Sequence, residues 1–288
     1  MKLALGGAQF GLVYGIANQG GQVRPDVLKG ILELSRAQGV DTIDTAKAYG
    51  ESESALGVAG TEGFNVITKL PSIPFDVLDV QQWVASQVAH SLRNLRVDAV
   101  YGLMLHRSHE WVGPHGKALV CAMQSLKAQG LVHKIGVSIY APSELTSVMQ
   151  AGGVDLVQAP FNLVDRSLVE SGWLQKLKAI GVEVHARSVF LQGLLLMPRD
   201  AIPAKFQRWA KLWDTWQAWQ QAANISAVQA CIGFVQSHTM LDRLVVGMDS
   251  LEQLQQLIDA SQHATPADWP DIGSQDVQLI NPSYWPTL

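Results

Sequence analysis

The chain has 288 residues, of which 48% are hydrophobic and 16% are charged. Because this apolar content can bury a large core, it excludes a mainly disordered chain. The net charge of −4 argues against a surface built for nucleic acid or for an anionic membrane. The most apolar run, Val189–Met197, is shorter than the roughly 20 residues that cross a bilayer, and the N-terminus lacks a signal-peptide pattern. We therefore expect a cytoplasmic protein.

Eight short apolar runs recur along the chain and alternate with longer helical patterns. Several of these runs are almost continuously apolar, which is typical of strands buried on both faces of a parallel sheet. The expected strands are Leu3–Ala8, Asp41–Asp44, Asn65–Lys69, Ala99–Leu105, Lys134–Val137, Leu156–Ala159, Val182–Ala186 and Arg243–Val246.

The helical patterns between these runs show apolar residues at helical spacing, and several of them end just before a glycine. Glycine is a usual residue just past a helix, because it adopts the left-handed conformation without strain. The expected helices are Val27–Leu34, Val80–Leu95, Ala118–Lys127 and Lys176–Ile180, with two further helix starts at Pro142 and Ser250.

Eight strand-then-helix units in one chain predict an α/β fold, a (β/α)8 TIM barrel forming a single domain over residues 1–288. The alternative is a doubly wound open sheet. That fold usually carries the spacing GxGxxG between its first strand and helix, and the segment Gly6–Gly11 does not fit this spacing. Within the barrel domain we expect a Trp-rich helical insertion over 199–222 and a C-terminal tail over 262–288 near the barrel mouth.

Four tryptophans of the expected insertion recur three and four residues apart, at Trp209, Trp213, Trp216 and Trp219. We interpret them as a buried aromatic face packed on the barrel, with a lid or an oligomer contact as the alternative. The two cysteines of the chain lie in apolar helical patterns without metal or redox spacing, and we interpret both as buried thiols.

If the fold is a barrel of this kind, we expect the chemistry at the C-terminal ends of the strands. Asp44 and Tyr49 follow the second expected strand, Lys69 ends the third and His106 follows the fourth. A nearby ammonium lowers the pKa of a phenol, a carboxylate keeps that ammonium charged, and a histidine can orient a carbonyl substrate. Together these groups form an acid for carbonyl reduction or a base for alcohol oxidation. Since no side chain supplies a hydride, a nicotinamide cofactor is implied.

Each of these four residues has a more ordinary explanation when it is considered alone. An aspartate after a strand is commonly a helix cap, a loop tyrosine commonly packs, and a single histidine is commonly structural. Their occurrence at the ends of three consecutive strands favours the catalytic interpretation.

Several separate motifs resemble the aldo-keto reductase superfamily. The most specific motif runs from Gly39 to Gly50 and continues at Glu53 and at Leu56-Gly57. The further matching segments are 67–70, 105–106, 135–138 and 157–162, and the resemblance covers roughly residues 3–257.

This resemblance implies a barrel that binds NADPH, less often NADH, in an extended pose across its mouth. It implies Tyr49 as the proton donor, tuned by Lys69 and Asp44, with His106 orienting the carbonyl. The residues implied to bind the cofactor are Gly7, Ala8, Ser138, Gln158, Arg187, Ser188, Gly247, Ser250 and Gln253. We expect NADP(H) rather than NAD(H), and no metal site.

The sequence departs from the family pattern at two positions near the expected nicotinamide. Ile139 stands where an asparagine usually contacts the carboxamide, and Asn162 is the candidate substitute. Arg187 stands where an aromatic ring usually stacks on the nicotinamide. A planar guanidinium can stack as well, and the alternatives are an acidic substrate or a carboxylate partner at the barrel rim.

A third departure concerns the segment after the eighth strand, where the family usually has a Lys or Arg for the 2′-phosphate. Residues 247–253 contain no base. Ser250 and Gln253 are candidates to bind the phosphate at the start of a helix. Asp249 would oppose a phosphate or instead accept a hydrogen bond from a ribose hydroxyl.

The combined expectation is NAD(P)H-dependent reduction of an aldehyde or ketone to an alcohol by a cytoplasmic enzyme, with Tyr14 and Trp111 bordering the substrate pocket. One alternative is a nucleotide-binding, redox-sensing barrel with negligible turnover. A metal-dependent hydrolase is the second, and His106, His109 and Asp44 are too few ligands to support it. The expected partner is a small carbonyl compound, without nucleic acid or membrane, and the chain is expected as a monomer or weak homo-oligomer.

Overall fold

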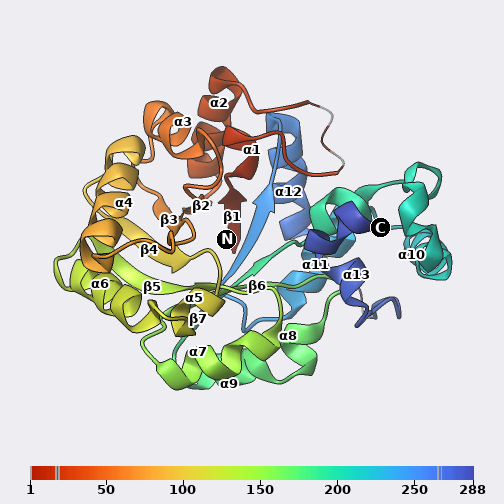
Figure 1. Cartoon of the computed structure of the whole chain (residues 1–288). Coiled ribbons are helices and arrows are strands. Elements are labelled where there is room, and N and C mark those ends of the chain that lie inside the picture. The colour runs from red at the N-terminus through yellow and green to blue at the C-terminus, as the bar shows by residue number, and fades with distance from the viewer. Residues whose placement is uncertain (1, 17, 19, 265, 267) are drawn as a thin grey trace.

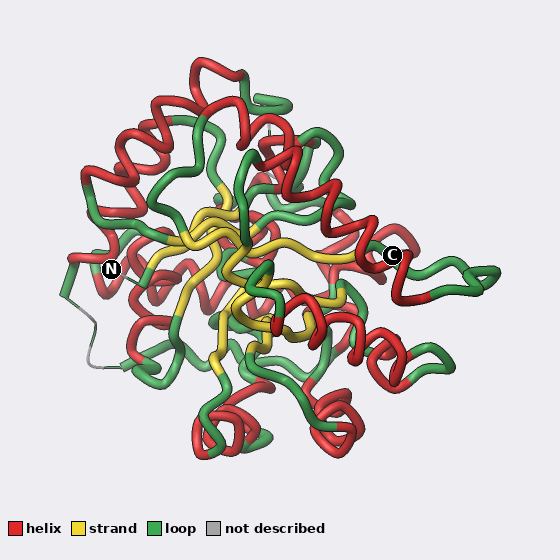
Figure 2. The backbone as a smooth tube through the Cα atoms, turned by 90° about the vertical axis from the view of Figure 1, so that its left-hand side faces the viewer, coloured by secondary structure: helices red, strands yellow, loops and turns green. Residues whose placement is uncertain are grey.

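The computed structural model of the chain describes residues 2–16, 18, 20–264, 266 and 268–288. Eight parallel strands pair in sequence order and form a closed barrel, because β8 pairs with β1. Helices surround this barrel on its outside (Figures 1 and 2). The strands are β1 (Leu3–Gly6), β2 (Thr42–Asp44), β3 (Asn65–Leu70), β4 (Val100–Leu105), β5 (Val132–Ser138), β6 (Leu156–Pro160), β7 (Glu183–Arg187) and β8 (Arg243–Gly247). The predicted TIM barrel is confirmed.

The helices follow the strands along the chain. The α-helices are α1 (Ala8–Gly11), α2 (Pro25–Ala37), α3 (Ser52–Ala59), α4 (Val80–Leu95), α5 (His109–Val112), α6 (Gly116–Ala128), α7 (Leu145–Ala151), α8 (Ser167–Glu170), α9 (Trp173–Ala179), α10 (Ala210–Ala223), α11 (Ala227–Ser237), α12 (Leu251–Gln262) and α13 (Val277–Ile280). Short 3-10 helices are η1 (Pro142–Glu144), η2 (Leu191–Leu196), η3 (Arg199–Ala201), η4 (Ala204–Trp209) and η5 (Pro282–Thr287).

Local chemistry sets several of these boundaries. The predicted helix Val80–Leu95 is observed as α4, where Asp79 accepts a hydrogen bond from the backbone N–H of Gln82 and Arg96 closes the helix in the left-handed conformation. Ser250 caps α12 in the same way. These side chains satisfy backbone groups that the ends of a helix leave unpaired.

The first strand ends earlier than the sequence predicts. The expected strand reaches Ala8, whereas β1 ends at Gly6 because the N–H of Gly7 donates to the carbonyl of Asp44 at 2.7 Å and a short helix then begins. At the end of this helix, a Cβ on Gly11 would lie 1.8 Å from the backbone oxygen of Tyr49. Gly11 therefore allows the segment after β2 to lie directly against α1.

The main apolar core lies between the strands and the surrounding helices, as expected for a parallel barrel. A separate small cluster of Ile67, Met104 and Leu156 fills the barrel interior. Gly102 leaves room for it, since a Cβ there would lie about 3.1 Å from Ile67 and 3.2 Å from Leu156. The interior is therefore packed, and ligands have access only near its ends.

The tryptophans of α10 are largely buried, as the helical spacing predicts. Trp213 and Trp216 are 1% and 3% exposed, and their indole N–H groups donate to the carbonyls of Phe206 and Leu195. Trp219 stacks on Trp216 with ring centroids 5.8 Å apart. This contact pattern is that of a packed aromatic face.

The described part of the C-terminal tail packs against the segment before α10 and the loop after β6. Lys205 donates to the carbonyl of Trp285, Arg208 pairs with Asp276, and Arg166 donates to the carbonyl of Pro270. In Figure 1 the C-terminus accordingly lies beside α10. Residues 265 and 267 of the expected tail lie outside the described residues.

The two cysteines differ in exposure, so the prediction of two buried thiols is wrong for one of them. Cys231 on α11 is buried, whereas Cys121 on α6 is exposed because it lies on the outer face of that helix. In the described ranges of the chain, no helix combines the length and the apolar character that crossing a membrane requires.

Candidate active site

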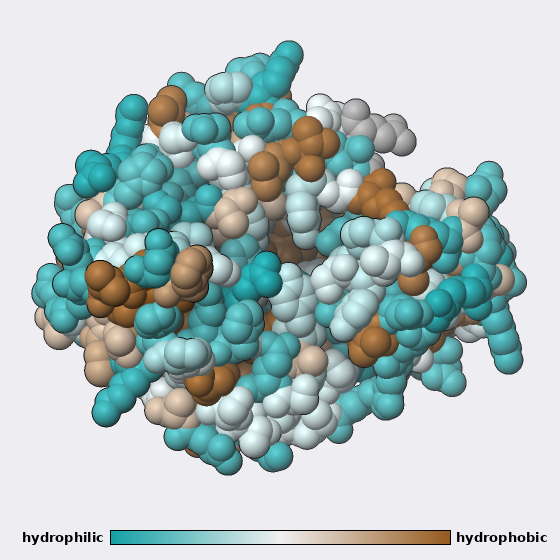
Figure 3. All heavy atoms as spheres, in the orientation of Figure 1, coloured by the Kyte–Doolittle hydropathy of each residue, from teal (hydrophilic) through white to brown (hydrophobic). Residues whose placement is uncertain are grey.

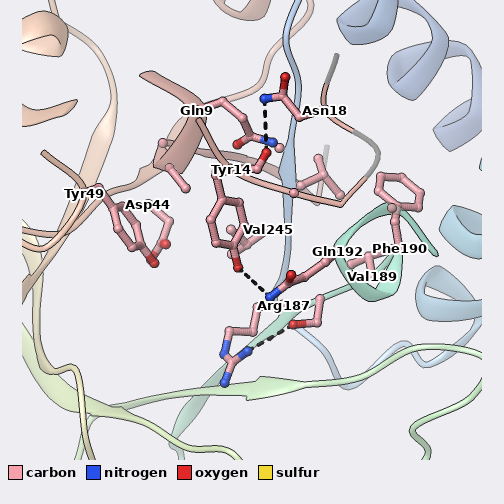
Figure 4. Close-up of a pocket in the computed structure, with 18 of the residues that line it drawn as sticks. Gln9, Tyr14, Asn18, Asp44, Tyr49, Arg187, Val189, Phe190, Gln192 and Val245 are labelled. Atoms are coloured by element: carbon pink, nitrogen blue, oxygen red, sulfur yellow. Dashed lines mark hydrogen bonds between the residues drawn. The ribbon is translucent and has the colours of Figure 1, made fainter. Parts of the chain in front are cut away.

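A cleft of about 310 Å³ opens at the C-terminal ends of the strands, which is a volume typical of small-molecule sites. Figure 3 shows it as a hollow near the centre of the face, and Figure 4 shows its wall. Twelve residues that the sequence predicts for the site line it: Gly7, Ala8, Tyr14, Asp44, Tyr49, His106, Ser138, Gln158, Arg187, Ser188, Gly247 and Gln253.

A buried ion pair forms the floor below Tyr49. The ammonium of Lys69 lies 2.6 Å from Oδ2 of Asp44, and it also donates to the carbonyl of Thr45 at 3.0 Å. The other oxygen of Asp44 accepts a hydrogen bond from Gln158 at 2.7 Å. Burial lowers the pKa of Lys69, and the neighbouring Asp44 opposes this effect. The paired carboxylate thus holds a charged lysine in an interior from which water is excluded.

Tyr49 lies between this ion pair and His106. Its ring meets the imidazole of His106 edge-on with centroids 5.7 Å apart, and the ammonium of Lys69 lies 5.2 Å from the ring centroid. Burial raises the pKa of Tyr49 above its usual value, and the charge of Asp44 adds to the increase. The phenol is therefore protonated at neutral pH and has a proton to donate.

The expected lowering of the Tyr49 pKa by lysine is not observed in this structure. The Lys69 ammonium forms its hydrogen bonds with Asp44 and Thr45, and it lies over the ring of Tyr49. Arg187 is the cation that lowers the pKa of Tyr49, but burial and the charge of Asp44 dominate.

His106 is electrically neutral at physiological pH. Burial lowers the pKa of His106 to about 4, and the positive charge of Lys69 acts in the same direction. A neutral imidazole keeps one N–H donor, which can orient a carbonyl oxygen without carrying a charge.

Ser138 and Gln158 lie side by side at the ends of β5 and β6. They pair in the strand register, and the hydroxyl of Ser138 lies 3.5 Å from the amide oxygen of Gln158. Ile139 points into the core, where it is fully buried. Asn162 does not join them, because its amide accepts from Val164 N in its own loop and donates to the carbonyl of Ser188 in the loop after β7.

Arg187 enters the cleft from the end of β7. Its guanidinium donates to the carbonyl of Ile139 at 2.9 Å and to the hydroxyl of Ser188 at 3.0 Å, and it lies over the ring of Tyr140. No carboxylate of the described residues lies within ion-pair distance of it. The structure therefore gives no support to a carboxylate partner at the rim, and the guanidinium brings an unpaired positive charge to the cleft.

The segment after β7 forms one wall in a strained backbone conformation. Ser188, Leu191 and Gln192 have φ angles of 58°, 47° and 53°, which only glycine adopts without cost. Gln192 also bridges the cleft, since its amide donates to the Tyr14 hydroxyl (Figure 4). Its carbonyl accepts a hydrogen bond from the N–H of Ile16. Strain of this kind is concentrated at binding sites.

Three predicted residues lie outside the cleft wall. Trp111 turns from α5 into the core, is 1% exposed and donates its indole N–H to the carbonyl of Gly152, so its assignment to the substrate pocket is corrected. Ser250 accepts a hydrogen bond from the N–H of Gln253 as the cap of α12. Lys69 lies beneath the surface of the cleft.

The cleft also contains residues that the sequence analysis did not assign to the site. Their common feature is a position just after a strand, which is the signal that could have found them. They include Gln9, Tyr140, Phe190 and Gln192. In the described ranges, no group of three or more His, Cys, Asp or Glu side chains is arranged to hold a metal ion.

A comparison with known sequences agrees with this geometry. The sequence model described as the Aldo/keto reductase family matches residues 2–272. The chain belongs to the aldo/keto reductase family. Members of this family act on carbonyl or alcohol groups with nicotinamide cofactors, so this aldo/keto reductase is an oxidoreductase.

The relatives of this aldo/keto reductase include proteins of known sequence and structure. The NADH-specific methylglyoxal reductase of Escherichia coli (strain K12) is 28% identical over 224 residues, which are 66% of this chain and 68% of that protein. An aldo-keto reductase from Bacillus halodurans in its holo form has a TM-score of 0.74 at 17% identity, covering 92% of this chain and 88% of that one. The glycerol dehydrogenase of Gluconobacter oxydans has a TM-score of 0.70 at 21% identity, covering 93% and 88%.

Proposed function

We propose that the chain reduces an aldehyde or ketone to the corresponding alcohol, with a reduced nicotinamide cofactor as hydride donor and Tyr49 as general acid. One hydride goes to the carbonyl carbon and one proton goes to the carbonyl oxygen, while the cofactor is oxidised. The observation that carries the proposal is the arrangement around Tyr49, a protonated phenol that lies between neutral His106 and the buried Lys69–Asp44 pair.

The other residues support this proton transfer. The N–H of His106 donates to the carbonyl oxygen and fixes its position beside the Tyr49 hydroxyl. Asp44 holds Lys69 beneath the phenol ring at 5.2 Å from the ring centroid, and Arg187 is the cation that stabilises the phenolate that remains after proton transfer. Proton return from water then restores the acid.

The cleft has the groups that a nicotinamide dinucleotide requires. Ser138 and Gln158 offer a hydroxyl and an amide side by side to a carboxamide, and the strained segment from Ser188 offers backbone groups. Gly7 and Ala8 line the opposite side through their backbone. When bound, the cofactor supplies the hydride, and these residues determine which face it presents.

A relative of known activity and the charge of the cleft indicate which substrate class to test first. The similarity to a methylglyoxal reductase supports a small carbonyl compound as the first substrate to test. The unpaired charge of Arg187, next to Tyr140, would also favour a carbonyl compound that carries an acidic group.

The test is an assay of cofactor oxidation, followed by loss of the reduced-nicotinamide absorbance, with methylglyoxal and with an activated aromatic aldehyde. Wild type is compared with Tyr49→Phe, and Tyr284→Phe is the matched control because Tyr284 lies in the tail, 46% exposed. Removal of a general acid costs about 10²- to 10⁴-fold, so we expect a loss of at least about a hundredfold in kcat for Tyr49→Phe and none for the control.

Two outcomes would contradict the proposal. Equal turnover by Tyr49→Phe and wild type would remove Tyr49 as the acid. Cofactor binding without turnover of any carbonyl compound in a broad panel would instead favour the nucleotide-sensing alternative.

A further inference from the structure

The cleft wall formed by the end of β8 and the start of α12 carries a carboxylate with unmet hydrogen-bonding capacity. Asp249 lies between these two elements and lines the cleft together with Gly247 and Gln253. Its Oδ1 atom is buried and makes no hydrogen bond with any group in the described part of the chain. Burial raises the pKa of Asp249, as expected for a carboxylate that has lost water without gaining a full set of donors.

The polar neighbours of Asp249 are already engaged. The side-chain oxygen of Gln253 accepts from the N–H of Asp249 at 2.8 Å, and the hydroxyl of Ser250 accepts from the N–H of Gln253 at 3.2 Å. Both side chains thus hold the first turn of α12. They are the residues that the sequence analysis assigns to a 2′-phosphate, and the structure gives them a capping role.

No cation among the described residues pairs with Asp249 on this side of the cleft. Among the described lining residues Arg187 is the only lysine or arginine, and its guanidinium is bonded to Ile139 and Ser188 at the end of β7. A phosphate dianion at the β8 wall would therefore meet an uncompensated carboxylate. Two like charges a few ångströms apart at an effective dielectric constant near 20 cost about tenfold or more in affinity.

Tyr49 and Asp249 line the same cleft, so a dinucleotide bound there would contact both walls. The nicotinamide ring must lie near Tyr49, where the carbonyl is protonated. Gln9 and Val245 line the same cleft (Figure 4), and Asp249 follows Val245 at the end of β8 as a further lining residue. A ribose with free 2′- and 3′-hydroxyls offers donors that a carboxylate accepts, whereas a 2′-phosphorylated ribose replaces one donor with negative charge.

We propose that Asp249 selects the cofactor, so that this chain binds NADH in preference to NADPH. The inference rests on the proposed function and specifies its cofactor. It replaces the expectation of NADP(H), which came from the family resemblance and for which the described residues of the β8 wall offer no lysine or arginine.

The test is direct binding, which does not depend on turnover. The chain contains nine tryptophans, so quenching of their fluorescence by NADH and by NADPH gives a Kd for each nucleotide. Wild type is compared with Asp249→Asn and with Asp249→Ser, and thermal unfolding verifies that both variants fold. Asp259→Asn is the matched control, because it removes the same charge from an exposed position of α12.

We expect wild type to bind NADH at least about tenfold more tightly than NADPH. Both Asp249 variants should reduce this preference about tenfold, mainly through tighter NADPH binding, while the control keeps the wild-type ratio. Binding of both nucleotides with a ratio that the Asp249 variants leave unchanged would overturn the inference alone. Failure of wild type to bind either nucleotide would overturn the proposed function itself.

Discussion

Lys69 and Asp44 form an ion pair whose side chains are 0% and 4% exposed. The desolvation of two such charges offsets much of their attraction, so the pair itself stabilises the fold weakly. Removal of one partner destabilises the fold strongly, because the other charge then stays buried without an opposite charge beside it.

The replacement Lys69→Met should therefore lower the free energy of unfolding by about 3–5 kcal/mol, measured by urea unfolding. Lys127→Met is the control, since Lys127 pairs with Asp155 at the same 2.6 Å distance but is 40% exposed. The control should lose no more than about 1 kcal/mol. Equal losses of unfolding free energy in the two variants would show that burial does not determine the cost of removing one partner of an ion pair.

His106 makes stability depend on pH in a defined direction. Its pKa is about 4 in the folded chain and about 6.5 when unfolded, so the unfolded state binds the extra proton between these values. The stabilising contribution of neutral His106 is present above pH 6.5 and is lost as the pH falls toward 4.

Between pH 7 and pH 5 the wild type should lose about 1–2 kcal/mol more of its unfolding free energy than His106→Gln does, allowing for solvent screening. Urea unfolding at the two pH values measures this difference. His133→Gln replaces an exposed histidine of β5 and should keep the wild-type dependence. A His106→Gln protein that is as pH-sensitive as wild type would contradict the assigned burial of the imidazole.

At the level of elements, Glu144 joins the segments after β4 and β5. One carboxylate oxygen accepts from the hydroxyl of Ser108, two residues after His106. The other accepts from the backbone N–H groups of Tyr140 and Ala141, at 2.9 Å and 2.6 Å. The carboxylate thus fixes the position of one cleft wall relative to the histidine.

The variant Glu144→Ala should lower kcat/KM for the carbonyl substrate about tenfold, mainly through a higher KM, because Tyr140 and the His106 segment lose their common anchor. Steady-state kinetics measure the change. Glu144→Gln, which retains an acceptor, should recover most of the loss, and Glu33→Gln on the exposed face of α2 is the control. A loss of kcat/KM in Glu144→Gln as large as that in Glu144→Ala, with Glu33→Gln unchanged, would contradict the positioning role of the carboxylate.

The sequence predicts the elements well wherever burial on both faces leaves a continuous apolar run. All eight strands are found within about two residues of their expected ends, and the catalytic candidates follow from their positions at those ends. The shift in the pKa of Tyr49 could not be predicted from the sequence, because the direction of the shift depends on burial and on the charge of Asp44. The inward turn of Trp111 and the positive φ angles near Gln192 also depend on tertiary contacts, which spacing does not encode.

On the scale of the whole molecule, the charged groups at the C-terminal end of the barrel line the cleft, whereas those at the N-terminal end stabilise the fold. Glu183 begins β7, away from the cleft, and accepts hydrogen bonds from His185, Lys134 and Tyr101. Burial would raise the pKa of Glu183, but these three partners lower it below its usual value. This network therefore serves stability, as is usual at the N-terminal face of a TIM barrel.

Glu183→Gln should therefore lower the free energy of unfolding by about 2 kcal/mol at pH 7 while kcat/KM changes less than about twofold. Because the carboxylate has a lowered pKa, its contribution is present above pH 4.5 and disappears below it, so the difference from wild type should shrink in acid. Urea unfolding and kinetics on the same preparations test both parts. A large fall in kcat/KM would contradict the separation of the two ends.

Because one thiol is exposed and the other is buried, the rate of chemical labelling of the buried thiol can measure how often the fold opens locally. An aromatic disulfide reagent should modify Cys121 at once and leave Cys231 intact, since burial also raises the pKa of the Cys231 thiol and suppresses the reactive thiolate. The slow labelling of Cys231 would then report how often α11 separates from the barrel. In a Cys121→Ser protein the labelling of Cys231 should follow a single exponential, whose rate reports this opening.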